Sequence, residues 1–411
     1  MEGILYSQRV EKNRRNGCVF SWNGIERQRN LKIVHIDMTG PYTEGMTYQE
    51  NIIPGEQVKL GHDVSLWVSC YCYKDGKEVA VPEEEKIMED GVRLRRFLYV
   101  NYGNEFINKK LRNIRGIYAR LEKMHPDIIM QHDAHTMVTS QICRYVEKHP
   151  KVKYIIDSHT DHLNSAKTFL SKYLLHRCIY KRYVRMAYDH AETVYCISPE
   201  VKKFLVSEYS IKKDKFRFLP LGSTVPDDEW YQNVRSSRRK ELGIDDNTTL
   251  FVHSGKLTPM KKTSSILRAM EGVTDKDCRL IIIGSADEEL EETIREAEKK
   301  DPRIQYLGWM DGTELREWLC AGDVYVSPGS QSNTVQTAMC CREAVLVYPY
   351  DNYKTLMKGT GAFVTSVKDI SYRMNYMAQN LDGLRKMKES AYKYADEYLN
   401  YAKQARILAE M

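Results

Sequence analysis

The sequence has no apolar run near the roughly 20 residues that a membrane-spanning helix needs. Its first 30 residues are basic and polar and lack the apolar stretch typical of a signal peptide. The ten cysteines include no Cys-x-x-Cys spacing, so we expect them to be buried thiols that behave as small hydrophobes. These absences predict a cytoplasmic protein in which residues 1–30 form a loosely held N-terminal extension.

No charge of one sign dominates the chain. The net charge is +6 over 411 residues, which is too weak to indicate nucleic acid as a partner. It is compatible with a phosphate-bearing substrate or with an anionic lipid surface.

Short apolar stretches recur along the chain, with helical sequence between them. In the first half they are 31–36, 62–68, 127–130, 154–156, 192–197 and 216–219, and in the second half 250–253, 279–283, 304–307, 324–326 and 344–347. Strands that alternate with helices predict parallel sheets covered on both faces, which is an α/β fold. We predict two doubly wound, Rossmann-like domains over residues 31–225 and 226–384, with a C-terminal helix over about 385–411 that crosses back to the first domain.

In such sheets ligands bind beyond the carboxyl ends of the strands. Gly255 and Lys256 follow the strand 250–253, and Lys261 comes five residues later. Two cations on a loop at this position can converge on a diphosphate, although surface lysines beside a helix start have the same spacing. Gly284 follows the strand 279–283 and predicts a turn close to the same ligand, or a turn with a structural role alone.

The loop after the strand 324–326 is rich in small and hydroxyl-bearing residues and precedes an apolar helix. It reads Ser-Pro-Gly-Ser-Gln-Ser-Asn-Thr from 327 to 334. The N-terminus of a helix offers unpaired N–H groups and a positive dipole end, which suit phosphate oxygens. The predicted donor-binding residues of this loop are Gly329, Ser330, Ser332, Asn333 and Thr334. Simple helix capping by Ser332 or Thr334 is the alternative.

Several short runs in the second half resemble one known family. They are 306–310, Glu314-Leu315, 321–324, Pro328 and Ala338-Met339. Together they resemble the C-terminal domain of GT-B glycosyltransferases, closest to the retaining group (glycosyl transferases group 1) that builds bacterial capsules, exopolysaccharides and glycolipids.

The resemblance implies a GT-B fold, with two Rossmann-like domains facing across a cleft. It also implies a UDP- or GDP-sugar donor, a hydroxyl of a glycan or lipid-linked acceptor, retention at the anomeric carbon, and no obligatory cofactor or metal. Under this resemblance Lys256 and Lys261 bind the donor diphosphate, and the stretch 307–310, which includes Trp309, holds the base.

The sequence departs from the family at one point. The group usually carries two glutamates eight positions apart around the loop, but no glutamate lies between Glu317 and Glu343. The Ala338-Met339 match puts the second glutamate on Thr337, beside Gln336. We therefore expect Gln336 to act at the reacting sugar and Thr337 to contact the donor, through neutral and hence weaker hydrogen bonds.

In the first half, the resemblance assigns the acceptor side and a catalytic histidine. The loop 39–47 matches a glycine-containing loop at Gly45, with Glu44 and Thr47 as polar neighbours. His159 matches a histidine that lies under the reacting sugar, where it would contact the donor and steady positive charge at the anomeric carbon. Thr160 and His132 complete the predicted acceptor side.

Two other functions remain open from the residues alone. The clusters His132/Asp133/His135 and Asp157/His159/Asp161 would suit a metallohydrolase. The missing glutamates instead suggest a catalytically weak, glycosyltransferase-like binding subunit of a glycosylation complex.

The stretch 166–187 is basic and rich in Tyr and Leu. It is either a helix that lies on the inner, anionic face of a membrane or a core helix with solvated lysines.

Overall fold

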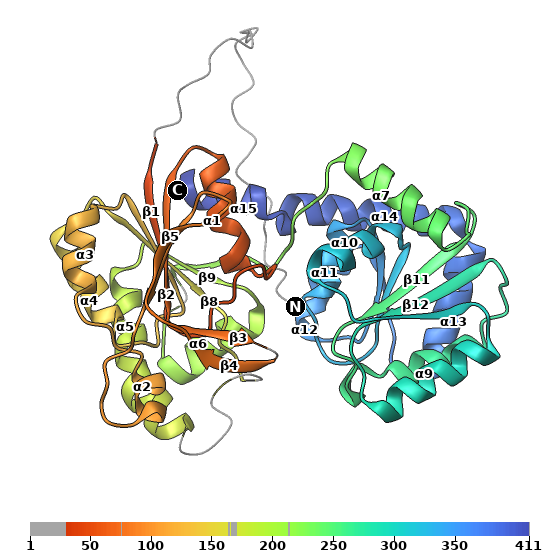
Figure 1. Cartoon of the computed structure of the whole chain (residues 1–411), viewed down its shortest axis with the longest axis horizontal. Helices are drawn as coiled ribbons and strands as arrows, with labels where there is room; N and C mark the ends of the chain where they lie inside the picture. Colours follow the sequence, from red (N-terminus) through yellow and green to blue (C-terminus); the bar gives the residue numbers. More distant parts are fainter. Residues whose placement is uncertain (1–29, 75, 163–164, 166–170, 213, 411) are drawn as a thin grey trace, which may run out of the picture. The chain divides into compact units, whose positions relative to one another are not determined.

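Parallel strands alternate with helices in both halves of the chain in the computed structural model (Figure 1), as the sequence predicts. The structure describes residues 30–410 except 75, 163–164, 166–170 and 213. The predicted N-terminal extension thus lies, apart from Asn30, outside the described residues. Residues Leu31–Met411 form one compact unit.

The first sheet has eight strands in the order β10-β9-β8-β7-β1-β2-β6-β5, and every pair is parallel except β5 with β6. The strands are β1 Lys32–Asp37, β2 Asp63–Ser69, β5 Glu85–Ile87, β6 Arg93–Phe97, β7 Ile128–His132, β8 Lys153–Ser158, β9 Thr193–Cys196 and β10 Phe216–Phe218. A separate hairpin is made by β3 Tyr71–Lys74 and β4 Lys77–Ala80. The strand order reverses between β1 and β7, and such a reversal is where doubly wound sheets bind ligands.

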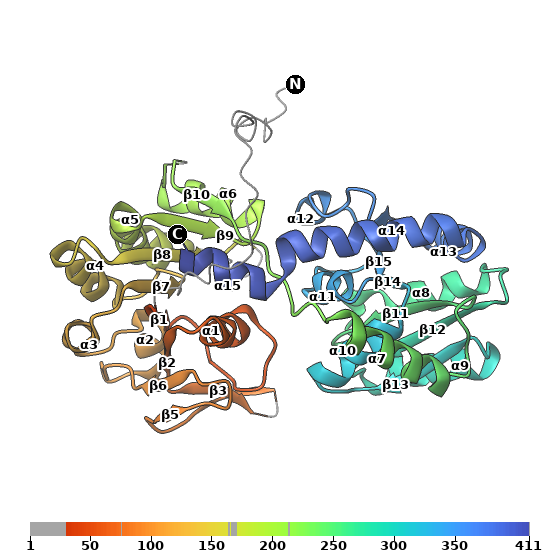
Figure 2. The same ribbon diagram turned by 90° about the horizontal axis from the view of Figure 1, so that it is seen from above.

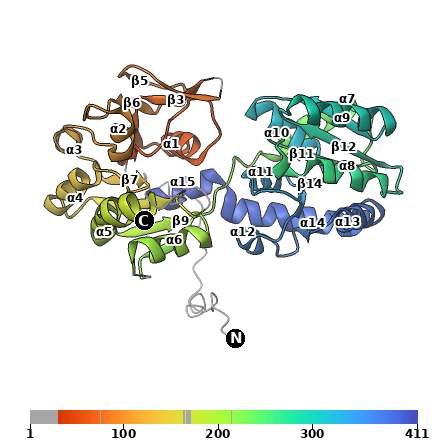
Figure 3. The same ribbon diagram turned by 90° about the horizontal axis from the view of Figure 1, so that it is seen from below.

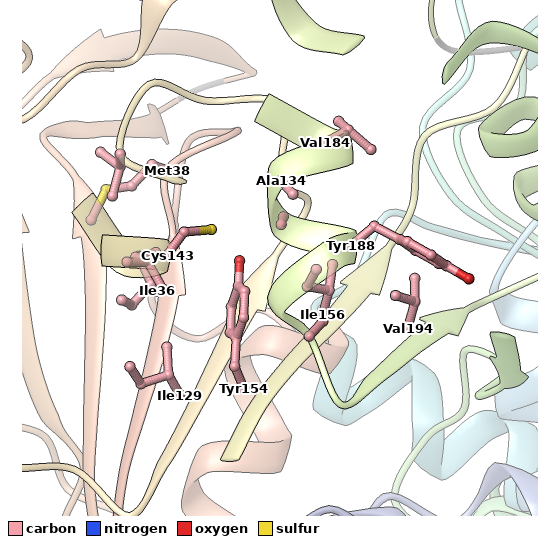
Figure 4. Packing of buried hydrophobic residues seen from close by; sticks show 14 of the residues in the cluster. Ile36, Met38, Ile129, Ala134, Cys143, Tyr154, Ile156, Val184, Tyr188 and Val194 are labelled. Atoms are coloured by element: carbon pink, nitrogen blue, oxygen red, sulfur yellow. The ribbon is translucent and has the colours of Figure 1, made fainter. Parts of the chain in front are cut away.

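Helices cover this sheet on both faces. They are α1 Gln49–Lys59, α2 Glu105–Leu111, α3 Ile117–Met124, α4 Thr139–Lys148, the π-helix η1 Ser171–Tyr180, α5 Lys181–His190 and α6 Pro199–Tyr209. Alternate residues of a strand point to the same face. Tyr154 and Ile156 of β8 accordingly share a core cluster with Ile129 of β7 and Cys143 of α4 (Figure 4).

The described part of the stretch 166–187 is helical, as predicted, and is formed by η1 and the start of α5. The apolar residues Val184, Ala187 and Tyr188 of α5 are buried, and Arg182 and Arg185 are exposed. The apolar face of α5 therefore packs into the protein, and only its basic side faces outward.

The second sheet has six parallel strands in the order β13-β12-β11-β14-β15-β16. They are β11 Thr249–Ser254, β12 Cys278–Ile283, β13 Ile304–Gly308, β14 Val324–Ser327, β15 Ala344–Val347 and β16 Gly361–Phe363. Counted within this half the order is 3-2-1-4-5-6, the arrangement of dinucleotide-binding domains. Its reversal lies between β11 and β14, which lead into the predicted lysine loop and the predicted hydroxyl-rich loop.

The helices of the second half complete the fold. They are α7 Asp228–Glu241, α8 Thr263–Glu271, α9 Glu288–Lys300, α10 Gly312–Ala321, α11 Thr334–Cys340, α12 Asp351–Lys354, α13 Val367–Gln379 and α14 Leu381–Tyr394, with a 3-10 turn η2 Pro259–Lys261. Helix α14 packs against β15 and β16, beside α13 (Figure 3). None of the described helices combines the length and apolarity needed to cross a membrane.

The C-terminal segment returns to the first sheet, as predicted. The π-helix η3 Ala395–Leu399 leads into α15 Tyr401–Glu410, which packs against α1 (Figures 1 and 2). The segment is fastened by backbone hydrogen bonds from Ser223 N–H to Leu399 O, 3.0 Å, and from Tyr401 N–H to Ser223 O, 3.1 Å. A Cβ on Gly222 would lie 1.8 Å from the carbonyl oxygen of Leu399, so only glycine allows this approach.

The apolar-run criterion missed five of the described strands: β3, β4, β5, β6 and β16. The first four are short and carry many charged or polar residues, such as Arg93, Arg95 and Arg96 in β6. Strands β5 and β16 lie at sheet edges, β6 lies between β2 and the antiparallel edge strand β5, and β3 and β4 form a separate hairpin. Strands in such places need not be apolar on both faces, so an apolar-run criterion does not find them.

Candidate donor pocket and its histidine centre

Three glycine turns join the carboxyl ends of β11, β12 and β13. Gly255 N–H donates to Ile283 O at 3.0 Å, and Gly284 N–H donates to Gly308 O at 2.7 Å. Gly284 has a φ of +139°, and a Cβ there would lie 1.8 Å from Gly255 O. The requirement for glycine at position 284 is therefore steric, and the turns form one connected edge.

Lys261 lies between this edge and the hydroxyl-rich loop. Ser330 N–H donates to Met260 O at 2.8 Å, and a Cβ on Gly329 would lie 2.2 Å from the same oxygen. The Lys261 ammonium donates to Gln331 O at 3.4 Å. The structure thus brings the lysine loop and the hydroxyl-rich loop into direct contact, although they are far apart in the sequence.

The two predicted lysines differ in environment. Burial lowers the pKa of Lys261, and the ion pairs found among the described residues do not include it. A half-buried cation without a carboxylate partner is costly unless an anion binds there. Lys256 is exposed on the same loop, and Trp309, beside the predicted base site, is 73% exposed.

The hydroxyl-rich loop is held by its own hydrogen bonds and by α12. Tyr353 accepts a hydrogen bond from Ser332 N–H at 2.8 Å, and the Ser332 hydroxyl donates to Thr334 Oγ1 at 3.1 Å. With its amide nitrogen facing two carbonyls, Gln336 donates to Ser332 O and Asn333 O at 3.1 and 3.2 Å. Thr337 donates back to Asn333 O at 3.4 Å. The loop is therefore ordered and ends in α11, a helix of seven residues.

A cavity of about 210 Å³ opens beside this loop. It is lined by His159, Asp161, Ile197, Ser198, Pro199, Phe218, Pro220, Leu221, Gln331, Ser332, Asn333, Gln336, Asn352, Tyr353, Thr355 and Leu356. His159 and Gln336, the two residues predicted to act at the reacting sugar, share this cavity. Asn352 and Tyr353, in α12 after β15, were not among the predicted site residues because no motif marks them.

His159 is held by the carboxylate of Asp157. Its Nε2 donates to Asp157 Oδ2 at 3.1 Å, and Asp157 is fully buried. Burial alone would lower the pKa of His159, but the charge of Asp157, aided by Asp133 and Glu50, outweighs it and raises the pKa to about 10. His159 is therefore an imidazolium at neutral pH, a cation and a hydrogen-bond donor.

Asp133 organises the turn that carries His159. The backbone N–H of His159 and the hydroxyls of Ser158 and Thr160 donate to its carboxylate at 3.2, 2.8 and 3.0 Å. Thr160 is 4% exposed and His132 is also 4% exposed, with both ring nitrogens of His132 engaged by protein groups. Both side chains are thus buried and engaged by protein groups, and their assignment to the acceptor side stays a prediction.

Two carboxyl groups near His159 were not among the predicted site residues. Burial raises the pKa of Asp37, at the end of β1, and of Glu50, in the first turn of α1, although the nearby histidines lower both. Asp37 is the last residue of β1, and Glu50 lies at the start of the following helix. Ligands of such sheets bind at this edge, so these positions are the sequence signal that could have identified both residues.

The residues of the predicted acceptor loop have the following neighbours, and their role stays a prediction. Glu44 forms ion pairs with Lys86 and Arg96, at 2.9 and 3.3 Å, and Gly45 is an exposed turn residue with φ +78°. Thr47 lies next to Gly312, at the start of α10, where an added Cβ would be 3.2 Å from its methyl group. None of the three lines the 210 Å³ cavity.

Glu343 does not replace the missing glutamates. It precedes β15, at the opposite, amino edge of the second sheet, and is 0% exposed. Burial, together with the charge of Asp323, raises its pKa well above the ordinary value and so favours the neutral form of the group. Within the described chain, the only carboxylate lining the cavity is that of Asp161.

The six-residue metal site suggested by the histidine clusters does not form. Of the described residues, His132, Asp157 and His159 are the one group of three whose ligand atoms lie within 4.8 Å of one another. Asp133 is occupied by the turn around His159. His135 is buried against Tyr180, with 5.2 Å between ring centroids.

The chain has two doubly wound sheets, and the second has the Rossmann strand order, with a cation loop and a hydroxyl-rich loop at its reversal point. This architecture is that of the GT-B class of nucleotide-binding proteins. Two family profiles match the chain: "Glycosyltransferase Family 4" over residues 55–223 and "Glycosyl transferases group 1" over residues 248–380. The chain belongs to this family of GT-B glycosyltransferases.

Similar proteins agree with this assignment. A GDP-mannose-dependent monoacylated alpha-(1-6)-phosphatidylinositol monomannoside mannosyltransferase of Corynebacterium glutamicum is 28% identical over 141 residues, which are 30% of this chain and only 35% of that enzyme. A UDP-Gal:alpha-D-GlcNAc-diphosphoundecaprenol alpha-1,3-galactosyltransferase of Escherichia coli is 22% identical over 72% of this chain and 73% of its own length. Anabaena HepE in complex with UDP shares the fold, with a TM-score of 0.63 and 13% identity over 92% of this chain and 99% of HepE.

Proposed function

We propose that the protein transfers a sugar from a UDP- or GDP-sugar to a hydroxyl of a lipid-linked or glycan acceptor, with retention at the anomeric carbon. The observation that carries the proposal is the shared cavity. It is lined by His159 from the end of β8 and by Gln331, Ser332, Asn333 and Gln336 from the loop next to Lys261. The similar enzymes named above use UDP-galactose and GDP-mannose on lipid-linked acceptors, which supports the donor and acceptor classes.

In the proposed reaction, Lys256 and Lys261 face the donor diphosphate and stabilise its growing negative charge as it leaves. Such preorganised charges in a partly desolvated site lower the barrier without reorganisation. The uncompensated, half-buried ammonium of Lys261 supports this role. Gly255 and Gly284 shape the loop edge, and main-chain groups at 307–310 beside Trp309 hold the base.

His159 takes a role that follows from its charge. An imidazolium does not steady a developing positive charge, but it can donate a hydrogen bond to a sugar hydroxyl or to a phosphate oxygen. Gln336 and Thr337 offer neutral groups where the family usually has glutamates, and Asn333 and Ser332 offer further amide and hydroxyl contacts. No metal or other cofactor is part of the proposed reaction.

An assay with a panel of UDP- and GDP-sugars tests the proposal. Each donor is incubated with undecaprenyl-diphosphate sugars, phosphatidylinositol mannosides or soluble oligosaccharides, with and without chelator, and the anomeric configuration of the product is read by NMR. We expect transfer with retention that is insensitive to chelator. Absence of nucleotide binding to the wild-type protein would sink the proposal, as would inversion for its stereochemical part.

The lack of a glutamate at the loop also supports a second function, a binding subunit that holds nucleotide or glycan with little turnover. The two are separated by one result. If UDP or GDP binds in a manner that Lys256→Ala/Lys261→Ala abolishes, but no donor is consumed with any acceptor, the binding subunit is favoured.

A further inference from the structure

A relay of buried polar side chains, Gln57, His35, His132 and Asp157, ends at His159, and its first three members have no role in the transfer as proposed. Gln57 Oε1 is 2.7 Å from His35 Nε2, and His35 Nδ1 is 3.0 Å from His132 Nε2. His132 Nδ1 is 3.0 Å from Asp157 Oδ2, and the same oxygen accepts from His159 Nε2 at 3.1 Å. The first four side chains are at most 4% exposed, and together the contacts span α1, β1, β7 and β8.

The direction of each hydrogen bond follows from what each atom can do. A carbonyl oxygen only accepts, so His35 Nε2 carries a hydrogen that it donates to Gln57. His35 is fully buried, and burial, with the charge of His132, lowers its pKa to about 3, so the ring is neutral and its Nδ1 accepts. His132 Nε2 must then donate to it. Because His132 Nδ1 faces a carboxylate oxygen, which also only accepts, both nitrogens of His132 carry hydrogens.

The electrostatic surroundings agree with a charged His132. Burial alone would lower its pKa, but the carboxylate of Asp157 outweighs burial and raises it, with smaller contributions from Asp37 on β1 and Glu50 on α1. Asp157 is in turn kept ionised: its pKa lies well below the ordinary value because His132 and His159 overcome the effect of burial.

We infer that Gln57, His35 and His132 are positioning residues. Gln57 and His35 keep His132 doubly protonated, and His132 in turn fixes the Asp157 carboxylate as the acceptor for His159. The inference rests on the proposed function, because His159 is the residue that would touch the donor sugar. The arrangement matters because Asp157 Oδ1 has no hydrogen-bond partner in the described structure. The orientation of the carboxylate therefore depends on the two N–H groups that share Oδ2.

The same hydrogen placement disfavours a metal at His132, Asp157 and His159. The nitrogens that face Asp157 carry hydrogens and so have no lone pair to offer an ion. Zn²⁺ would have to displace two charge-assisted hydrogen bonds and two protons.

NMR of the wild-type protein labelled with ¹⁵N-histidine tests the inference without any donor or acceptor. Resonances are assigned by single substitution of each histidine. At pH 7.5 we expect both ring nitrogens of His132 to be protonated and His35 to be neutral with its hydrogen on Nε2. A neutral His132 would overturn the inference, and so would loss of these resonances on adding stoichiometric Zn²⁺ to the chelator-treated protein.

Two substitutions test the link to His159. His35→Leu removes the acceptor for His132 Nε2–H, so we expect His132 to lose its second proton and the pKa of His159 to shift. We expect kcat to fall by about ten- to a hundred-fold, the range known for residues that orient metal-binding histidines through hydrogen bonds, with the KM for the donor changed much less. His35→Asn places a carbonyl oxygen near the lost Nδ1 and should restore most of the kcat.

His125→Asn is the matched control, because His125 is an exposed histidine at the end of α3 and lies outside the relay. Circular dichroism and nucleotide binding show whether each variant is folded. A folded His35→Leu protein with unchanged kcat and an unchanged His159 titration refutes the relay. If the wild-type protein transfers no sugar, the proposed function fails, but the protonation state of His132 still decides the relay.

Discussion

Single residues at this site differ in environment more than their spacing indicates. Lys256 and Lys261 form one motif in the sequence, yet Lys256 is exposed and Lys261 is half-buried against the carbonyl of Gln331. A charge held in a partly desolvated place interacts more strongly with a bound anion than one in water does. We therefore expect Lys261 to contribute more to donor binding than Lys256.

Lys261→Ala should weaken UDP or GDP binding by about 2 kcal/mol, roughly thirty-fold in Kd, which is the usual size of a lost charge-assisted hydrogen bond. Isothermal titration calorimetry measures this. Lys262→Ala is the control, because Lys262 is exposed on the same loop and lies over the ring of Tyr348, 5.0 Å from its centroid. Equal loss in both variants would contradict a specific role for Lys261.

Glu343 allows a prediction about pH. Its pKa is raised well above its ordinary value near 4.5, by burial first and then by Asp323. The unfolded chain therefore releases this proton above about pH 4.5 while the folded chain keeps it, so the folded state loses stability as pH rises from there. Glu343→Gln removes the effect.

The variant and the wild-type protein should have similar free energies of unfolding at pH 4, and the variant should gain an increasing advantage up to pH 8. Urea denaturation at several pH values checks this. Nucleotide affinity, measured in parallel, should not change, because Glu343 lies at the amino edge of the sheet. A gap that does not depend on pH would show that Glu343 is ionised in the folded protein.

At the scale of elements, the site depends on turns that approach closely at one edge of the second sheet. The turns after β11 and β12 touch through Gly255 and Gly284, and the loop after β14 touches η2 through Gly329. Each contact brings backbone to backbone, and a Cβ on Gly284 or on Gly329 would prevent it. The positions of the predicted donor loops thus depend on Gly284 and Gly329 for steric reasons.

Gly284→Ala should disturb this edge. The new Cβ would overlap Gly255 O, and the φ of +139° is unfavourable for alanine, so we expect a loss of more than about 1 kcal/mol in the free energy of unfolding. Nucleotide binding should fall as well. Gly40→Ala is the control, since a Cβ there meets nothing within 4 Å and Gly40 has no positive φ. Thermal unfolding and titration calorimetry on both variants decide the matter.

At the scale of the whole molecule, the C-terminal segment packs on the first half of the chain. Helix α15 packs on α1, and Gln404 of α15 donates to Pro220 O at 2.9 Å, so the C-terminal segment fastens the stretch 220–223 that leads from the first sheet to the second. The π-helix η3 and Asn400, which pairs with Ser223, form the bend that directs α15 to this place.

Adjacent residues of α15 provide a matched test of this packing. Leu408 is 1% exposed and Ile407 is 48% exposed. Leu408→Ala should lower the free energy of unfolding by about 2–5 kcal/mol, as cavity-forming substitutions do. Ile407→Ala should cost less than about 0.5 kcal/mol, as surface substitutions do. Urea denaturation measures both, and similar losses would mean that α15 is not packed as described.

The sequence alone determined the repeating strand and helix order, the family, and the loops that carry the site. Local periodicity and motif spacing suffice for these, because most central parallel strands are apolar and ligands of such sheets bind beyond the carboxyl ends of the strands. The strand 344–347 was predicted to the residue. The division of the chain near residue 225 and the roles of the individual site residues stay predictions.

Only the tertiary structure decided which polar residues meet. His35, Gln57, His132 and Asp157 lie on four elements spread over a hundred residues, and no local pattern links them. The placement of hydrogens on the side chains from Gln57 to Asp157, and hence the charge on His159, depends on burial and on which donor and acceptor atoms face each other. Burial and atom-to-atom contact are properties of packing between distant segments, so a linear pattern could locate His159 but could not assign its protonation state.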